Sequence, residues 1–250
     1  MLSKNQIKLI NNLKTKRYRS KHKLFIAEGV KVIKEFLKSD YELEALYTTV
    51  DIFSVDAKKY FLIDESELKK VSCLTTPQIA LALFEIPTDE FENEENEGNN
   101  SGLKLVLDGV RDPGNLGTII RLCDWFDVNE LVCSSDTVDC YNPKVVQATM
   151  GSLARVSIRY QDLETFFKKN TLPVYGAFMD GKPIYTTEVS QDAVIVMGNE
   201  AQGISKETSF YVQERISIPQ FGDPAVESLN VATASSILLN EFKRLSFIEK

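Results

Sequence analysis

The stretch Leu107–Val128, LDGVRDPGNLGTIIRLCDWFDV, decides the fold of the second half of the chain. An apolar strand ends at Asp108, and Asp-Pro-Gly then makes a turn. Pro113 fixes the turn and glycines allow close backbone approach. An apolar helix follows, with Asp112 or Asn115 as its candidate cap. The pattern predicts a βα unit of an α/β protein, in which one arginine, Arg121, is expected to need a buried partner or a ligand.

The strands that follow read as continuous apolar runs. They are expected at residues 103–108, 130–135, 154–160, 173–179, 193–198 and 215–219. Runs without alternation are typical of strands buried on both faces, so we expect a mostly parallel sheet with helices on both faces. Ligands bind beyond the carboxyl ends of such strands. The loops after Asp108, Met197 and Ile218 are therefore the candidate site.

The first half of the chain predicts a separate, smaller α/β domain. Short strand-like runs at 24–28, 43–49, 60–63 and 80–86 are separated by amphipathic or polar helical stretches. Residues 89–102 are acidic and nearly free of apolar side chains, which is typical of a linker. We therefore expect a small domain over 1–88, a flexible linker over 89–102 and a second, larger domain over 103–250.

Charge is distributed unevenly along the chain, although the net charge is −7. Residues 1–38 carry nine lysines and two arginines against two glutamates. A basic arm of this kind favours a nucleic-acid partner, because lysine and arginine displace counterions from phosphates. An ordinary solvated helix face is the alternative. The candidate phosphate contacts are Lys14, Lys16, Arg17, Arg19, Lys21 and Lys23.

Composition limits the remaining classes. The four cysteines show no CxxC spacing and the chain has a single histidine, His22, so we expect reduced thiols and no metal site. No apolar run reaches 18 residues and the amino terminus lacks a signal-peptide core, so we expect a cytoplasmic protein without a membrane span.

Two further loops add chemistry to the first. Gly198, Glu200 and Gly203 form G-x-E-x-x-G after a strand; without a lysine this is not a phosphate-binding P-loop. The third loop begins at Ile218-Pro219 and leads to Ser228 and Asn230 before a helix rich in small residues. Each loop alone could be an ordinary strand-to-helix turn.

Together, in this order and spacing, the three loops resemble the motifs of the SpoU/TrmH family of RNA ribose 2′-O-methyltransferases, in the SPOUT superfamily. Asn115, Gly117 and Arg121 match the first motif and the G-x-E-x-x-G loop matches the second. The third is matched by Ile218, Pro219 and Glu227 to Asn230. Cys123, Asp127 and Thr149 depart from residues usual near these motifs, which weakens assignment to a subfamily.

The resemblance implies a deep trefoil knot in the catalytic domain, an L30e-like amino-terminal domain that binds RNA, and a homodimer formed through the knotted domain. It implies S-adenosylmethionine as cofactor, held around Met197, Gly198, Gly203, Ile218 and Leu229. The implied catalytic residues are Arg121, Asn115, Glu200, Ser228 and Asn230. Arg121 would stabilise the developing alkoxide, and the proton acceptor is either Arg121 or an RNA phosphate.

The implied substrate is structured RNA, with 23S ribosomal RNA favoured by the separate amino-terminal domain. The alternatives are a transfer-RNA 2′-O-methyltransferase, a non-catalytic RNA-binding protein of the same fold, and an α/β enzyme that binds phosphates through its glycine loops. The modified nucleotide cannot be read from the sequence.

Overall fold

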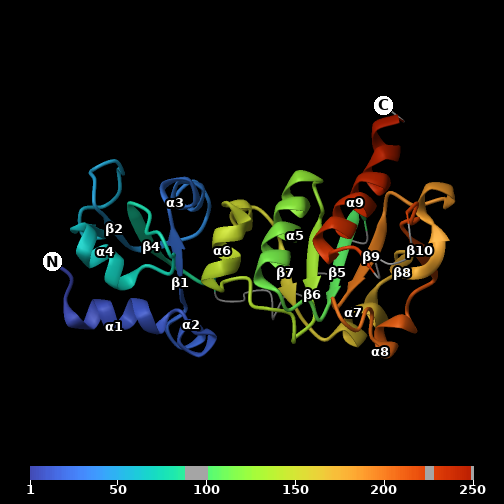
Figure 1. Ribbon diagram of the computed structural model, residues 1–250, viewed down its shortest axis with the longest axis horizontal. Coiled ribbons are helices and arrows are strands. Elements are labelled where there is room, and N and C mark those ends of the chain that lie inside the picture. The colour runs from blue at the N-terminus through green and yellow to red at the C-terminus, as the bar shows by residue number, and fades with distance from the viewer. Residues whose placement is uncertain (88–100, 223–227, 249–250) are drawn as a thin grey trace. The chain divides into compact units, whose positions relative to one another are not determined.

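The computed structural model describes residues 1–87, 101–222 and 228–248 (Figure 1). Contacts divide the chain into two compact units. Unit 1 contains residues 1–94 and 139–155, and unit 2 contains residues 95–138 and 156–250. The segment 139–155, expected in the catalytic domain, therefore belongs with unit 1. The linker expected over 89–102 lies outside the described residues, apart from its last two positions.

Unit 1 is a four-stranded sheet with helices packed against it. The strands are β1 (Leu24–Glu28), β2 (Leu43–Thr48), β3 (Tyr60–Leu62) and β4 (Ala80–Glu85), in the order β1-β4-β2-β3. β4 is antiparallel to β1 and β2, whereas β2 and β3 are parallel. The helices of its first segment are α1 (Lys4–Asn12), α2 (Lys16–His22), α3 (Val30–Phe36) and α4 (Glu65–Val71). The segment 139–155 adds α6 (Pro143–Thr149) and the short helix η2 (Ser152–Ala154).

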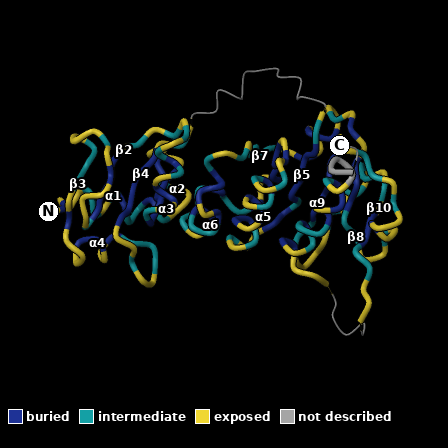
Figure 2. Tube along the Cα trace, turned by 90° about the horizontal axis from the view of Figure 1, so that it is seen from above, coloured by how far each residue is buried: buried dark blue, intermediate teal, exposed yellow. Residues whose placement is uncertain are grey.

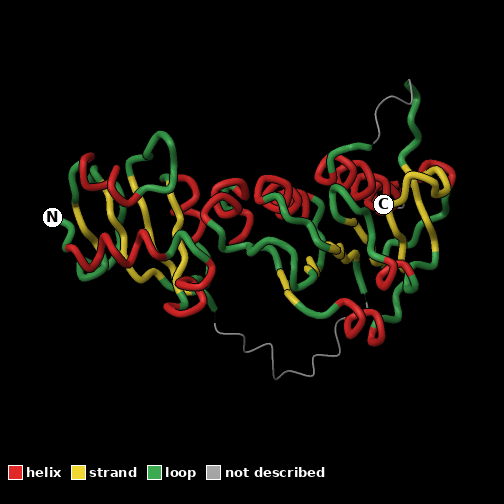
Figure 3. The backbone as a smooth tube through the Cα atoms, turned by 60° about the horizontal axis from the view of Figure 1, so that its bottom comes forward, coloured by secondary structure: helices red, strands yellow, loops and turns green. Residues whose placement is uncertain are grey.

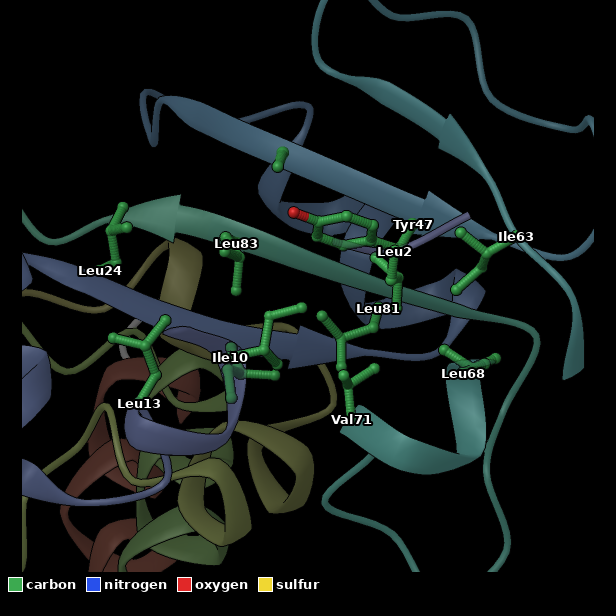
Figure 4. Close-up of a cluster of buried hydrophobic side chains, with 12 residues drawn as sticks. Leu2, Ile10, Leu13, Leu24, Tyr47, Ile63, Leu68, Val71, Leu81 and Leu83 are labelled. Carbon is green, nitrogen blue, oxygen red and sulfur yellow. The ribbon is translucent and has the colours of Figure 1, made fainter. Parts of the chain in front are cut away.

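The amphipathic helix α1 begins at a capping box. Ser3 accepts a hydrogen bond from the Gln6 backbone, and the Gln6 side chain accepts one from the Ser3 backbone. Ile10 of α1 and Leu13 just beyond it are fully buried. They pack with Leu81 and Leu83 of β4 (Figure 4). The basic helix α2 follows α1 in the chain and contacts β1.

Unit 2 is a six-stranded sheet in which every pairing is parallel. Its strands are β5 (Leu103–Asp108), β6 (Glu130–Cys133), β7 (Ile158–Tyr160), β8 (Val174–Pro183), β9 (Ala193–Gly198) and β10 (Glu214–Ser217), in the order β10-β8-β9-β5-β6-β7. Its helices are α5 (Pro113–Trp125), α7 (Leu163–Lys169), η3 (Ile184–Thr186), α8 (Lys206–Ser209) and α9 (Val231–Ile248). In both units the strands lie side by side with helices around them (Figure 3).

The central strands of unit 2 are covered on both faces. Successive residues of β5 and β9 are buried, as the dark trace of β5 in Figure 2 shows. Val106 and Val196 pack with α7, whereas α9 contacts both β9 and α5. The expected parallel sheet, covered by helices, is confirmed. None of the described helices is long and apolar enough to cross a membrane.

The four cysteines are all present as thiols, and Cys123, Cys133 and Cys140 are buried. Burial raises the pKa of Cys73 to about 12. The thiolate form of Cys73 is therefore disfavoured, and no disulfide joins any of the four cysteines, all of which lie among the described residues.

Candidate active site

The first two motif loops leave the sheet side by side. Asp108 at the end of β5 is the register partner of Gly198 at the end of β9. Two hydrogen bonds join the loops: Asn199 Nδ2 donates to the Gly109 carbonyl over 2.6 Å, and the Ser205 backbone donates to Asp108 Oδ2 over 2.8 Å. The loops that follow β5 and β9 are thus held together by hydrogen bonds at the carboxyl-terminal edge of the sheet.

The second loop is a tight turn that exposes Glu200. A Cβ atom on Gly198 would lie 2.1 Å from the carbonyl carbon of Gly203, so only glycine fits there. Gly203 has φ +69° and exchanges backbone hydrogen bonds with Asn199. Asn199 Oδ1 also accepts from the Ala201 and Gln202 backbones. The two glycines and Asn199 therefore shape the turn, and Glu200 projects from it.

The first loop begins α5 with a complete cap. Asp112 accepts a hydrogen bond from the Asn115 backbone over 2.9 Å, and Pro113 occupies the first helical turn. The cap is Asp112, so the Asn115 side chain is free for other partners. Those partners come from the other two motifs.

Three side chains, one from each motif, form a continuous hydrogen-bonded relay. Asn230 Nδ2 donates to Asn115 Oδ1 over 2.8 Å, and Asn115 Nδ2 donates to Glu200 Oε1 over 2.9 Å. These residues lie 115 and 85 positions apart in the chain. The fold therefore brings together the asparagines and the glutamate that the sequence predicted separately.

The direction of the relay follows from the start of α9. Asn230 Oδ1 accepts hydrogen bonds from the Ala232 and Thr233 backbones, so its Nδ2 must point the other way and donate. Asn115 must then accept with its oxygen and donate with its nitrogen. A carboxylate at position 200 can only accept, which fits the end of this series. One oxygen of Glu200 accepts from Asn115; Oε2 has no partner among the residues that the structure describes.

Arg121 lies where the sequence pattern did not predict it. The buried side of α5 carries Leu116, Ile119 and Ile120, whereas Arg121 is exposed. It shares the outer face with Thr118 and Trp125, at helical spacings of three and four. Of the two expected alternatives, a buried partner is not found and a ligand remains a prediction: within the described part of the chain, Arg121 makes no hydrogen bond or ion pair, and it is exposed.

The predicted cofactor residues differ in how far their side chains are exposed. The Met197 side chain is buried in the sheet, so only its backbone can face a ligand. Ile218 is half-buried, Leu229 is 46% exposed, and Ser228 is exposed beside it. Open aliphatic side chains next to main-chain groups suit a flat, neutral adenine. The residues present therefore fit S-adenosylmethionine; Glu227 lies outside the described residues.

The basic residues of unit 1 divide into two groups. Lys16, Arg17, Lys21 and Lys23 are exposed on or next to α2. The other two are occupied within the fold. The Lys14 amine donates to the Ser72 carbonyl over 2.9 Å. The Arg19 side chain is 3% exposed and pairs with Asp139 over 2.6 Å. Arg19 is thus a structural cation rather than a free phosphate ligand.

Comparisons with known proteins agree with this site. The SpoU rRNA Methylase family model matches residues 102–240, and the MRM3-like substrate binding domain model matches residues 4–82. Because the first match covers more than half of the chain, the protein belongs to the SpoU rRNA methylase family. It is an RNA methyltransferase, and S-adenosylmethionine is its cofactor.

The similarity extends over nearly the full length of the matched chains. The 23S rRNA (guanosine(2553)-2′-O)-methyltransferase RlmP of Bacillus subtilis is 28% identical over 95% of this chain and 96% of its own. A putative RNA methyltransferase of the TrmH family from Porphyromonas gingivalis superposes with a TM-score of 0.85 at 38% identity, over 98% of this chain and 99% of that one. An AdoMet-bound rRNA methyltransferase from Sinorhizobium meliloti superposes with a TM-score of 0.84 at 28% identity, covering 98% and 96%.

Two useful residues were missed from the sequence. Asn199 ties the first two loops together and Asp108 holds the Ser205 backbone, whereas the cap at Asp112 was one of the two expected alternatives. Position offered a signal for both missed residues. Asp108 and Asn199 stand at or directly after the ends of buried strands, where side chains can bridge neighbouring loops.

Proposed function

We propose that this protein transfers a methyl group from S-adenosylmethionine to a ribose 2′-hydroxyl of 23S ribosomal RNA. The observation that carries the proposal is the relay Asn230–Asn115–Glu200, which unites the three motifs at one edge of the sheet. The ribosomal RNA substrate is supported by the similarity to RlmP over nearly the full length of both chains. The identity of the modified nucleotide is left to experiment.

The reaction needs alignment and stabilisation of charge. The cofactor supplies an electrophilic methyl group on its sulfonium. A ribose hydroxyl is a weak nucleophile at neutral pH, and its attack develops negative charge on oxygen. Arg121 is exposed on α5 and has no ion-pair partner among the residues that the structure describes. A guanidinium keeps its proton in proteins, so Arg121 serves as an electrostatic stabiliser of the alkoxide, and an RNA phosphate takes the proton.

The relay residues prepare the site for that step. Glu200 has an acceptor oxygen beyond the one bonded to Asn115, which can orient a ribose hydroxyl or the Arg121 guanidinium. Asn230 fixes the Asn115 amide, and Ser228 stands exposed two residues before Asn230. The trefoil knot that we propose for unit 2 is inferred from membership of the family. The residues that hold the cofactor in this proposal are Met197, Gly198, Gly203, Ile218 and Leu229.

Unit 1 delivers the RNA in this proposal. Lys16, Arg17, Lys21 and Lys23 form an exposed basic cluster around α2, suited to phosphates. The match to a substrate binding domain over residues 4–82 supports this role, and an L30e-like fold of this unit is proposed with it.

A homodimer through unit 2 is also part of the proposal. Helices α5 and α9 contact each other and, with η3, line a shallow groove. Its lining includes Leu122, Trp125, Phe126, Tyr185 and Ile237. Trp125 is 83% exposed and Tyr185 50% exposed, which is unusual for large aromatic side chains in a monomer. Because Arg121 lies one turn before Trp125, a second copy covering this groove would approach the catalytic arginine.

The proposal is tested by methyl transfer with labelled S-adenosylmethionine. We expect transfer to 23S rRNA from cells lacking the gene, and no transfer by Arg121→Ala, which should still bind the cofactor. Comparable methylation by Arg121→Ala would contradict the role of the arginine. Transfer to tRNA instead of rRNA would contradict the substrate, and cofactor binding with no transfer to any RNA would point to a non-catalytic RNA-binding protein.

A further inference from the structure

The segment Asp139–Arg155 has an unusual place in the fold. Its two ends continue into β6 and β7 of unit 2, yet its contacts assign it to unit 1. Helix α6 packs against β1, as Figure 1 also shows, and η2 packs against α3. Unit 1 therefore consists of the amino-terminal chain together with a segment that lies, in the sequence, between two strands of the catalytic half.

An ion pair between buried Arg19 and half-buried Asp139 joins the two pieces. Both Nε and Nη2 of Arg19 bond to Asp139 Oδ2, over 3.0 and 2.6 Å, and Nη1 donates to the Leu13 carbonyl. The other Asp139 oxygen accepts from the Tyr141 backbone. Both charged groups are fully partnered, and removal of Asp139 would leave the buried charge of Arg19 uncompensated.

Aromatic packing makes a second contact between the pieces. The Tyr141 ring lies 4.9 Å from the Phe25 ring, and the Tyr141 hydroxyl lies 3.1 Å from that of Tyr41. Tyr41 in turn meets Phe36 edge to face at 5.1 Å. Tyr141 thus enters the aromatic core of unit 1.

Glu35, next to the end of α3, makes the third contact. Arg155 Nη1 bonds to Glu35 Oε2 over 2.5 Å. Gly151, with φ +100°, lies so close that a Cβ atom on it would be 2.6 Å from Glu35 Cγ. The segment therefore contacts the amino-terminal part of unit 1 from one end to the other, at Arg19, at Phe25 and at Glu35.

We propose that Asp139–Arg155 is the docking segment through which the amino-terminal chain is attached to the catalytic half, and that the peptide connection between β4 and β5 is not needed for this attachment. A partly buried ion pair, an aromatic contact and a shape-matched glycine together form an intramolecular interface of the kind that centres a specific complex. Only the description of unit 1 as RNA-binding rests on the proposed function; the attachment does not.

The experiment cuts the connection in the full-length protein. A protease recognition sequence with glycine-serine flanks is inserted after residue 95, and cleavage is followed on a denaturing gel. We expect the two fragments of the wild type to co-elute on native size exclusion and to separate only in denaturant. Separation of the fragments in native buffer would overturn the proposal.

Variants identify the contacts that carry the attachment. The double variant Asp139→Ala/Tyr141→Ala should weaken fragment association by at least about 100-fold. The control Lys144→Ala, an exposed position on α6, should have no effect. Continued association of the double variant would overturn the assigned role of the pair and the ring.

A second measurement does not depend on cleavage. Hydrogen exchange of the uncut double variant should speed up in β1 and α3 and stay unchanged in β5 and β9. Unchanged protection of β1 would contradict the docking role. We also expect the cut wild type to methylate RNA at the rate of the uncut protein. If the uncut protein itself fails to methylate, the proposed function fails while the association result stands.

Discussion

Replacing Asn115 with aspartate removes one hydrogen bond of the relay without changing the shape of the side chain. The new carboxylate would still accept from Asn230 Nδ2, over 2.8 Å in the wild type, but could not donate to Glu200. Two carboxylate oxygens would then face each other where a 2.9 Å hydrogen bond stands. Rotating the side chain does not help, because both oxygens of a carboxylate only accept.

The size of the effect depends on solvent. Glu200 and Asn230 are exposed, so water can replace the lost bond in the free protein, and we expect the stability of Asn115→Asp to fall by less than about 1 kcal/mol. With RNA and cofactor over the site, a lost bond to a charged group costs about 1.5–3 kcal/mol, or about 10- to 150-fold in kcat/KM. Steady-state methyl transfer, compared with thermal unfolding, separates the two effects.

A second change should restore the missing bond. In Asn115→Asp/Glu200→Gln, the amide introduced at position 200 can donate to the carboxylate introduced at position 115, so most of the lost kcat/KM should return. Glu200→Gln alone keeps an acceptor for Asn115 and is expected to lose less than Asn115→Asp. If the double variant is no more active than Asn115→Asp while Glu200→Gln remains active, the relay is not what the asparagine provides, and this reasoning is refuted.

Three further changes test other parts of the account. Trp125→Lys should yield a monomer by light scattering if α5 and α9 form the dimer surface; an unchanged mass would contradict that surface. Burial raises the pKa of Tyr41 to about 12 and also raises that of Tyr141. Because these folded-state pKa values exceed the ordinary value of about 10, the two protonated hydroxyls stabilise the fold fully below about pH 10. This stabilisation is lost as the pH rises towards 12, by roughly 1–3 kcal/mol. The Tm of Tyr41→Phe should therefore fall less steeply over this range than the Tm of the wild type. Lys104→Met should destabilise unit 2 by about 1–3 kcal/mol in denaturant unfolding, since buried Glu130 would then keep Arg159 alone as its cation among the described residues; an unchanged midpoint would mean that the pair contributes nothing.

The strands were predictable because a strand buried on both faces consists of consecutive apolar residues, which can be recognised in the sequence. β5 and β9 read as unbroken apolar runs, and in the structure almost every residue of both is buried. The motif residues were equally visible as polar side chains and glycines directly after these strands. Their hydrogen bonds were not, because the relay joins positions 85 and 115 residues apart.

The errors arose from surroundings that local patterns do not contain. Arg121 stands in an apolar helix, but its face is shared with Thr118 and Trp125, so the helical spacing could have indicated exposure. Arg19 looks like any other member of a basic cluster until Asp139, 120 residues later, folds against it. The same long-range pairing explains why 139–155 was expected with the catalytic half. The cytoplasmic location and the knot stay predictions.

The central claim is that this protein methylates a ribose 2′-hydroxyl of 23S rRNA. The most direct measurement is mass spectrometry of nucleosides and fragments from 23S rRNA of cells lacking the gene, before and after treatment with the purified protein and S-adenosylmethionine. We expect one 2′-O-methylated nucleotide that is missing without the protein and restored by the wild type, but not by Arg121→Ala. A methyl group on a base, or unchanged 23S rRNA with a new methyl group in tRNA, would contradict it.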